Sequence, residues 1–336
     1  MAGIKALRRL QIGKESLVAP GTAVAATTIW RGTGTIDDTR KVVTVTEDVG
    51  TLIPPVRTYN AAYGAELAME SVEATFEQLP YLLNASIASV VTGVADGAAC
   101  KVYTFNFPEA TSNTIRTFTI EGGDNMEAER MEYSHVTDFT LTGKGGEAVM
   151  MSANWAGRQV ALNAFTAGQV IPTVEEILFS KGVLAIDNVA TGAVYGTTPV
   201  SNTFLEMSFS YRSGWIPVWT ADGGTGLLFN FIKCNKPQAT LDITFEHDAS
   251  SMAEKVLWRA GTPRLIQVKF EGTALGGVVY DAKTLILNLA GTWTKFSKLG
   301  EQDGNDIIVG TFEVGYDPTR ADAGSIIVVN ANAALT

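Results

Sequence analysis

The side chains most often used in catalysis and metal binding are scarce and scattered in this sequence. The chain has two histidines, His135 and His247, and two cysteines, Cys100 and Cys234. A zinc site would have to combine them with carboxylates, and they do not stand at ligand spacing. A Ser-His-Asp triad would have to use a histidine that stands in, or at the end of, an alternating strand pattern. We therefore expect no catalytic residue, no metal site and no cofactor, and we predict that the protein is not an enzyme.

A glycine-rich segment invites a phosphate-binding interpretation, which fails on its sequence. Gly143-Lys144-Gly145-Gly146 lacks the Ser or Thr that follows Lys in a P-loop and holds magnesium. We interpret the segment as a turn, because glycine adopts positive φ without steric cost. A second turn of this kind is expected at residues 300–304.

Composition sets the class of protein. Of 336 residues, 46% are hydrophobic and 18% charged, so a large core can form and disorder is not expected. The formal net charge is -10, which argues against a dedicated nucleic-acid binder, because such domains need a basic face. The apolar runs are far shorter than the ~18–20 residues that cross a bilayer, so we expect no membrane association. The polar stretch after Arg9 argues against a signal peptide.

The dominant periodicity is two, which predicts a mainly β chain. Alternating segments rich in β-branched and aromatic residues include 41–46, 102–107, 117–120, 204–211, 240–245, 265–270, 285–289 and 307–312. Asp96-Gly97, Asp222-Gly223 and Asp303-Gly304 are turn signals. Two short helices are expected, at 79–87 and 252–260, and a third at 174–181. In the second, Ser251 and Glu254 form a capping-box pattern, and Met252, Val256, Leu257 and Ala260 form the stripe expected to be buried.

Strand, helix, strand and glycine-turn hairpin occur in the same order in both halves of the chain. The hairpins are 136–157 and 293–315, and the helices precede them in equivalent places. This order predicts a duplication, although residues 20–60 and 200–236 cannot be aligned. The predicted organisation is an N-terminal arm (1–26), a first β domain (27–175), a linker (176–200) and a second β domain (201–336).

On three stretches and this element order, the sequence resembles the tail tube proteins, or major tail proteins, of siphophages. The stretches are 8–15 together with 20–26, Gly50-Thr51-Leu52-Ile53-Pro54-Pro55, and 72–80. The resemblance implies two tandem β-sandwich tube domains, each with a short flanking α-helix and a long hairpin, whose inner sheets form a β-barrel ring on assembly. It implies stacked rings around a lumen that encloses the tape-measure protein and lets phage DNA pass without specific binding. It also implies contacts with tail-tip and terminator proteins, and a place in the virion tail after synthesis in the bacterial cytoplasm. Family members with two tube domains form trimeric rings with pseudo-six-fold symmetry; one tube domain with an accessory domain, and hence a hexamer, is the other interpretation.

Two kinds of segment are candidates for contacts between rings. The hairpins 138–148 and 295–307 could project beyond the sandwich or could be simple solvent hairpins; their candidate residues are Asp138, Gly143, Lys144, Gly146, Lys295, Gly300, Asp303 and Gly304. The N-terminal segment with Arg8, Arg9 and Gln11 could be an arm that orders on assembly, or could be plainly disordered.

The leading functional hypothesis is a self-assembling tail tube subunit. A carbohydrate- or receptor-binding β-sandwich, such as an adhesin or a capsid decoration protein, is the alternative, and exposed tryptophans in a groove would favour it. A β-sandwich glycosidase is the third, and it would require two paired carboxylates in one cleft.

Overall fold

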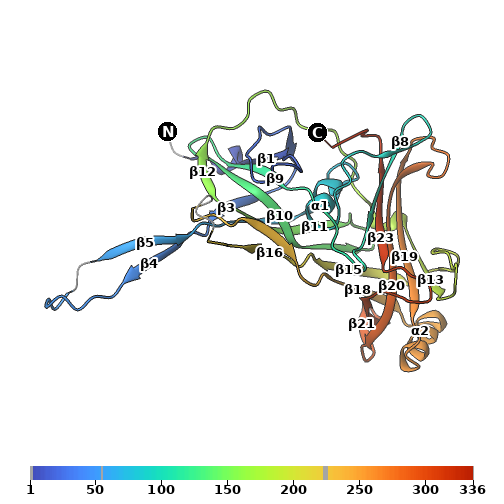
Figure 1. Ribbon diagram of the computed structural model, residues 1–336. Coiled ribbons are helices and arrows are strands. Elements are labelled where there is room, and N and C mark those ends of the chain that lie inside the picture. The colour runs from blue at the N-terminus through green and yellow to red at the C-terminus, as the bar shows by residue number, and fades with distance from the viewer. Residues whose placement is uncertain (1–2, 54–55, 222–225, 336) are drawn as a thin grey trace.

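The computed structural model describes residues 3–53, 56–221 and 226–335 and shows a mainly β chain (Figure 1). All pairings between the described strands are antiparallel, as the alternating sequence pattern predicts. Their sheets stay open, because the pairings branch and do not return to their starting strand. The turn signal Asp222-Gly223 and the residues Pro54 and Pro55 lie outside the described residues, as do Met1 and Ala2.

One long sheet crosses the whole molecule. Its eight strands lie in the order β3 (Gly34–Asp38), β6 (Ala65–Glu73), β11 (Met150–Gly157), β10 (Ala128–Lys144), β15 (Phe204–Arg212), β18 (Gln238–Glu246), β22 (Asn305–Val314) and β20 (Ala282–Phe296). Strand β21 (Gly300–Gln302) continues the β20 edge along β22. We call this the long sheet.

The C-terminal part of β10 and of β20 lies in the long sheet, and the N-terminal part of each strand belongs to a second, separate sheet. The sheet entered by β10 has the order β2 (Thr28–Trp30), β1 (Arg9–Lys14), β9 (Phe118–Gly123), β10 and β12 (Val160–Asn163). The sheet entered by β20 has the order β14 (Pro199–Val200), β13 (Gly182–Asn188), β19 (Arg264–Ala274), β20, β23 (Gly324–Asn330), β8 (Cys100–Asn106) and β7 (Val94–Asp96). Each transition is marked by an irregular register, such as that between Val136 and Asp138, which bends the strand.

The pairing order of the first half recurs in the second half. Strands β1 to β3, β6 and β9 to β12 have counterparts, in chain order, in β13 to β15, β18, β19, β20, β22 and β23. Helix α1 (Leu79–Ser86) follows β6 as α2 (Ala249–Arg259) follows β18. A hairpin interrupts each half at the same place: β4 (Lys41–Val45) with β5 (Arg57–Ala62), and β16 (Trp215–Val218) with β17 (Phe231–Cys234). These hairpins occupy the two sequence segments that could not be aligned.

A single hydrophobic cluster joins the halves. It lies on one face of the long sheet, where alternate residues such as Phe139, Phe209 and Leu241 are buried. Helix α1 is buried along its whole length, and β8 from the first half pairs with β23 of the second. The lysine Lys283 also bonds across the halves, with its Nζ 2.6 Å from Glu77 and 3.1 Å from Glu175.

Several expectations about the elements are wrong. Helix α2 begins at Ala249, because Asp248 caps it and shares a reciprocal hydrogen-bond pair with Ser251. The expected helix at 174–181 is a 3-10 turn, η2 (Phe179–Lys181), and a second such turn, η1, spans Lys5–Leu7.

Helix α2 also turns a different face inward from the one expected. Met252 is 36% and Val256 57% exposed, while Glu254 is buried. The inward position goes to Glu254 because it forms a buried ion pair with Arg264, with an oxygen 2.7 Å from the guanidinium, and accepts a hydrogen bond from Trp293.

The predicted arm and linker both contain strands of the second sheets. Within the arm, residues Arg9–Lys14 form β1, an interior strand between β2 and β9, so this part of 1–26 is not an arm. Within the linker 176–200, β13 and β14 pair in the sheet of the second half. The sequence pattern does not indicate β1 and β13, because their central residues are buried in a continuous run and show no alternation, and β14 has only two residues.

Candidate functional site

The side chains on the outward face of the long sheet are almost all polar. Because opposed residues share a face, the register places these side chains together. They form rows across the strands: Asn154, Asp138, Arg212 and Gln238; Ser152, Thr140, Ser210, Thr240 and Glu313; Met150, Thr142, Ser208, Asp242, Thr311 and Lys295; and Lys144, Glu206, Thr244 and Val309. The rows contain more carboxylates than cations. This polar face is therefore a hydroxyl-rich, acidic wall backed by the core.

The two halves join within this wall, where β10 pairs with β15. Seven consecutive residue pairs link them, from Asp138 opposite Arg212 to Lys144 opposite Glu206. Both end pairs have opposite charges, and Lys144 Nζ lies 3.3 Å from Glu206 Oε1. We call this the internal joint.

The long sheet has free edges at β3 and at β20–β21. Strand β3 pairs with β6 alone among the described strands. The residues that flank β3, Thr33 and Thr39, also direct backbone groups to this side, where they bond Glu70 and Gly64. Because backbone groups alternate in direction along a strand, Ile36 and Asp38 direct theirs to the open side. Two surface hollows flank β3, and both are lined in part by Arg8, Gly34 and Thr35.

The opposite edge is formed by the end of β20 and by β21. Ser297 donates its N–H to Val309 of β22, so the neighbouring Phe296 directs its backbone groups outward. Lys295 and Lys298 are exposed along this edge, and Asp37 is exposed along β3. Asp38 on β3 is paired with Arg40, and β21 carries Glu301, so among the described residues the opposite charges left unpaired at these edges include those of Lys295 and Asp37.

The first predicted inter-ring hairpin lies within the wall and does not extend beyond it. Asp138 is in the internal joint, and Gly145 at the turn donates its N–H to Leu205 of β15. At Gly143 an added Cβ would come within 2.4 Å of the Phe179 ring, so glycine is required for packing. Gly146 has φ +87°, as a turn position needs.

The second predicted hairpin is the β21–β22 turn at the end of the long sheet, beside α2 (Figure 1). Its turn residues Asp303 and Gly304 both have positive φ, and Gly300 begins β21. Gln302 donates a hydrogen bond of 2.8 Å to Glu206 of the wall.

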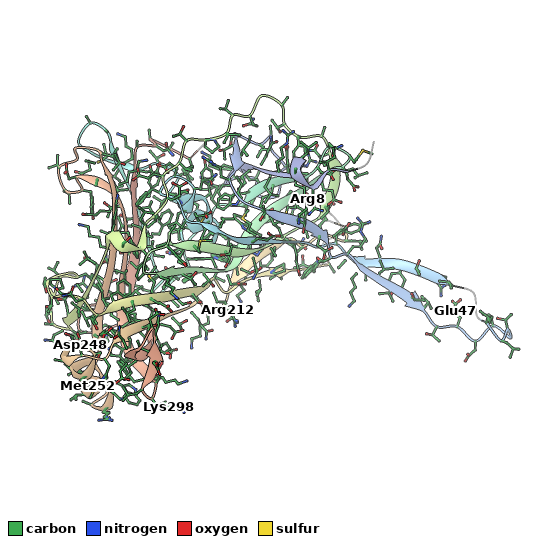
Figure 2. The ribbon with its side chains drawn as sticks, turned by 180° about the vertical axis from the view of Figure 1, so that it is seen from behind. Arg8, Glu47, Arg212, Asp248, Met252 and Lys298 are labelled. Carbon is green, nitrogen blue, oxygen red and sulfur yellow. The ribbon has the colours of Figure 1, made fainter. Side chains whose placement is uncertain are left out.

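The segment that extends farthest from the body is the β4–β5 hairpin, which the sequence did not reveal as a projection (Figures 1 and 2). The sequence pattern predicts β4 but gives no indication of its partner β5. Of the candidate arm residues, Arg8 and Arg9 lie at the start of β1, and Gln11 is buried within it. Arg9 stacks on Phe165, with its Cζ 4.0 Å from the ring centroid.

The residues with catalytic potential lie apart from one another. His135 is buried in β10, and burial lowers its pKa to about 4, while His247 Nε2 lies 3.2 Å from Met252 Sδ beside α2. Among the described residues, no group of three His, Cys, Asp or Glu side chains could hold a metal ion. In the same residues, no helix is long and apolar enough to cross a bilayer.

The tryptophans mainly serve the core. Trp30, Trp155 and Trp293 are buried, whereas Trp219 is 48% exposed and packs edge-on against Phe229. This arrangement does not build the row of exposed rings that a sugar-binding groove would present. No known family model matches the chain, and no curated protein matches it.

Proposed function

We propose that this protein is a structural subunit of a phage tail tube, in which copies join side by side through their long sheets into a ring and the rings stack. In this proposal each half is a β-sandwich tube domain with its own flanking helix. Three chains then complete a ring with pseudo-six-fold symmetry, as the resemblance to two-domain tail tube proteins implies. The polar face of the long sheet lines the lumen.

The observation that carries this proposal is the internal joint. It pairs the β10 edge of the first half with the β15 edge of the second, and the pairing order makes β20 the counterpart of β10 and β3 the counterpart of β15. Each copy therefore has one unpaired edge of each kind. Joining β20 of one copy to β3 of the next repeats a contact already present in the chain and removes the free edges.

The backbone directions support the same join. In the internal joint Phe139 pairs with Tyr211, and their counterparts from the register are Phe296 and Asp38. Both counterparts direct their backbone groups to open sides of the sheet. The expected intermolecular pair is thus Phe296 opposite Asp38, with Lys295 near Asp37 on the polar face.

The chemistry of the polar face supports a conduit. Hydroxyl groups and carboxylates on the wall offer DNA few cationic contacts, and it is such contacts that bind phosphates by releasing counterions. The wall would therefore let phage DNA pass and would enclose the tape-measure protein without holding either tightly. Tail-tip and terminator proteins would cover the two ends of the stack in the virion tail.

The test compares the wild type with two variants at the free β3 edge. Asp38→Pro removes an outward N–H that the proposed joint needs, whereas Asp38→Ala keeps that N–H and removes the same carboxylate. Light-scattering mass and negative-stain electron microscopy should show three-chain rings or tubes for the wild type and for Asp38→Ala. Asp38→Pro should remain a folded monomer by circular dichroism. Equal assembly of Asp38→Pro and Asp38→Ala, or a wild type that remains monomeric at every concentration, would contradict the proposal.

A further inference from the structure

The two inserted hairpins have the same place in the fold but different surroundings. The β16–β17 hairpin lies on the first half of its own chain, and the β4–β5 hairpin extends away from the body (Figure 1). This difference is informative, because the pairing order makes the hairpins counterparts.

The β16–β17 hairpin and its connections contact helix α1 and strand β10. Trp215 Nε1 donates a hydrogen bond of 3.1 Å to the carbonyl oxygen of Ser86, the last residue of α1. Ser213, just before β16, donates a hydrogen bond of 2.7 Å to the carbonyl oxygen of Val136. Phe229 packs against Tyr133 in a tilted arrangement, with ring centroids 4.9 Å apart. The β16–β17 hairpin of the second half thus covers the C-terminal end of α1 in the first half.

The β4–β5 hairpin carries apolar side chains that are exposed among the residues the structure describes. Val42, the counterpart of Trp215 in the register, is 55% exposed, and Tyr59 on β5 is 54% exposed. Farther along the hairpin, Val49, Leu52, Ile53 and Val56 are also exposed.

Within the described part of the chain, helix α2 lacks a covering hairpin like the one that buries the end of α1. All residues of α1 are buried, but in α2 only Ser251 and Glu254 are buried. Met252 and Val256, one turn apart, present an apolar strip to solvent at the end of the molecule that carries the β20 edge (Figure 2). The sequence pattern predicts burial for this strip, and the chain alone does not provide it.

We infer that the β4–β5 hairpin of one copy seats on helix α2 of the neighbouring copy in the same ring. This inference rests on the proposed ring, since joining β20 to β3 brings α2 of one copy to the side from which β4–β5 of the next extends. Val42 then lies near the C-terminal end of α2, as Trp215 lies at the end of α1. This contact adds to the β20–β3 pairing between copies on the core side of the wall, and it buries the apolar strip of α2.

Disulfide trapping tests this placement. Val42→Cys combined with Ala260→Cys puts one thiol on the hairpin and one at the exposed end of α2. After mild oxidation of assembled rings, non-reducing electrophoresis should show covalent dimers and closed trimers. Each single variant, and Leu162→Cys combined with Ala260→Cys as an exposed control on β12, should remain monomeric under the same conditions.

A second pair of variants tests the apolar strip without requiring two cysteines to come within disulfide distance. Val256→Asp should raise the concentration needed for ring formation at least tenfold, while Val170→Asp, at an exposed valine in the loop after β12, should change it less than threefold. Both should unfold at the wild-type temperature, because both positions are on the surface of the single chain.

The outcomes separate this inference from the proposed function. Three-chain rings that form no cross-link, or that cross-link only after they have stacked, would overturn the hairpin placement and leave the ring intact. A wild type that forms no ring would overturn the proposed function and this inference with it.

Discussion

Lys144 Nζ lies 3.3 Å from Glu206 Oε1 at the point where the first half of the chain meets the second. At the other end of the same joint Asp138 lies opposite Arg212. Opposite charges therefore flank a run of strand pairs that holds the two halves in one sheet. Such cross-strand pairs contribute about 0.2–1 kcal/mol each and, more importantly, disfavour a shifted register.

The joint that we propose between copies should depend on opposite charges in the same way as the internal joint. Lys295→Glu places a carboxylate near Asp37 of the neighbouring copy and should weaken each joint by about 0.2–1 kcal/mol. Because a ring repeats the joint, the losses add, and the concentration for assembly should rise several-fold. The double variant Lys295→Glu with Asp37→Lys should recover most of the loss.

Sedimentation velocity at low and high salt measures this effect. Screening should shrink the difference between Lys295→Glu and the wild type as the salt concentration rises, since both side chains are exposed. Glu109→Lys, in the exposed loop that follows β8 and away from both free edges of the long sheet, changes a charge by the same amount with the opposite sign and serves as the control. A double variant that assembles no better than Lys295→Glu would argue against the expected register.

The turn at the end of β10 tests how tightly the wall is packed. Gly143→Ala should destabilise the protein by about 1–3 kcal/mol, because the new methyl group would overlap the ring of Phe179. Gly145→Ala, two residues along, meets only the Leu205 carbonyl oxygen at 3.9 Å and should change stability by less than about 0.5 kcal/mol. Urea unfolding followed by tryptophan fluorescence compares the two variants. Equal urea midpoints would show that the Phe179 ring can move aside at little energetic cost.

The sequence predicts where the strands and helices lie along the chain better than it predicts which strands pair with one another. Alternation locates strands such as β15 and β18, and Pro80 with its apolar neighbours locates α1, because each signal is contained in a few consecutive residues. The partner of a strand depends on contacts far along the chain. For this reason the sequence predicts β4 but not its partner β5, and it places β1 in an N-terminal arm.

The candidate site shows the same limit. The predicted hairpin residues Asp138 and Lys144 do lie at a contact between sheets, but the contact is the internal joint, since β15 pairs beside them. The sequence also predicts burial for Met252 and Val256, and the chain leaves both exposed. Which residues line the polar face follows only from the register, because a shift of one residue exchanges the two faces.

The ion pairs of Lys283 should couple the two halves. Burial raises the pKa of Glu175, but hydrogen bonds from Lys283 and Thr273 outweigh it, so that the pKa lies below its usual value. Lys283→Met leaves the buried Glu77 carboxylate without its cation and should cost about 3–5 kcal/mol of unfolding free energy. Lys283→Met combined with Glu77→Gln should recover part of this cost, because only the less buried Glu175 carboxylate then lacks its cation.

Thermal unfolding of these variants measures the coupling. The exposed pair of Lys269 and Glu271 supplies the control, since Lys269→Met should cost less than about 1 kcal/mol. A double variant as unstable as Lys283→Met alone would mean that the loss comes from packing of the lysine stem.

The buried His135 should make stability fall in mild acid. Burial lowers its pKa in the folded chain to about 4, and an unfolded histidine titrates near 6.5. Between these values the unfolded chain binds the extra proton, so folding stability decreases as the pH falls from about 6.5 toward 4. The full loss is on the order of 3 kcal/mol, from a shift of roughly two and a half units at 1.36 kcal/mol each.

Removing the titrating group should flatten this dependence. His135→Leu should lose less stability between pH 7 and pH 4.5 than the wild type, when the slopes of urea-unfolding free energy against pH are compared. His247→Leu, which replaces the other histidine, beside α2, serves as the matched comparison. A slope in His135→Leu as steep as that of the wild type would assign the acid sensitivity to carboxyl groups whose pKa is held below its usual value by hydrogen bonds that outweigh burial, such as Asp96, Asp187 and Asp322, because their protonation also costs folding stability.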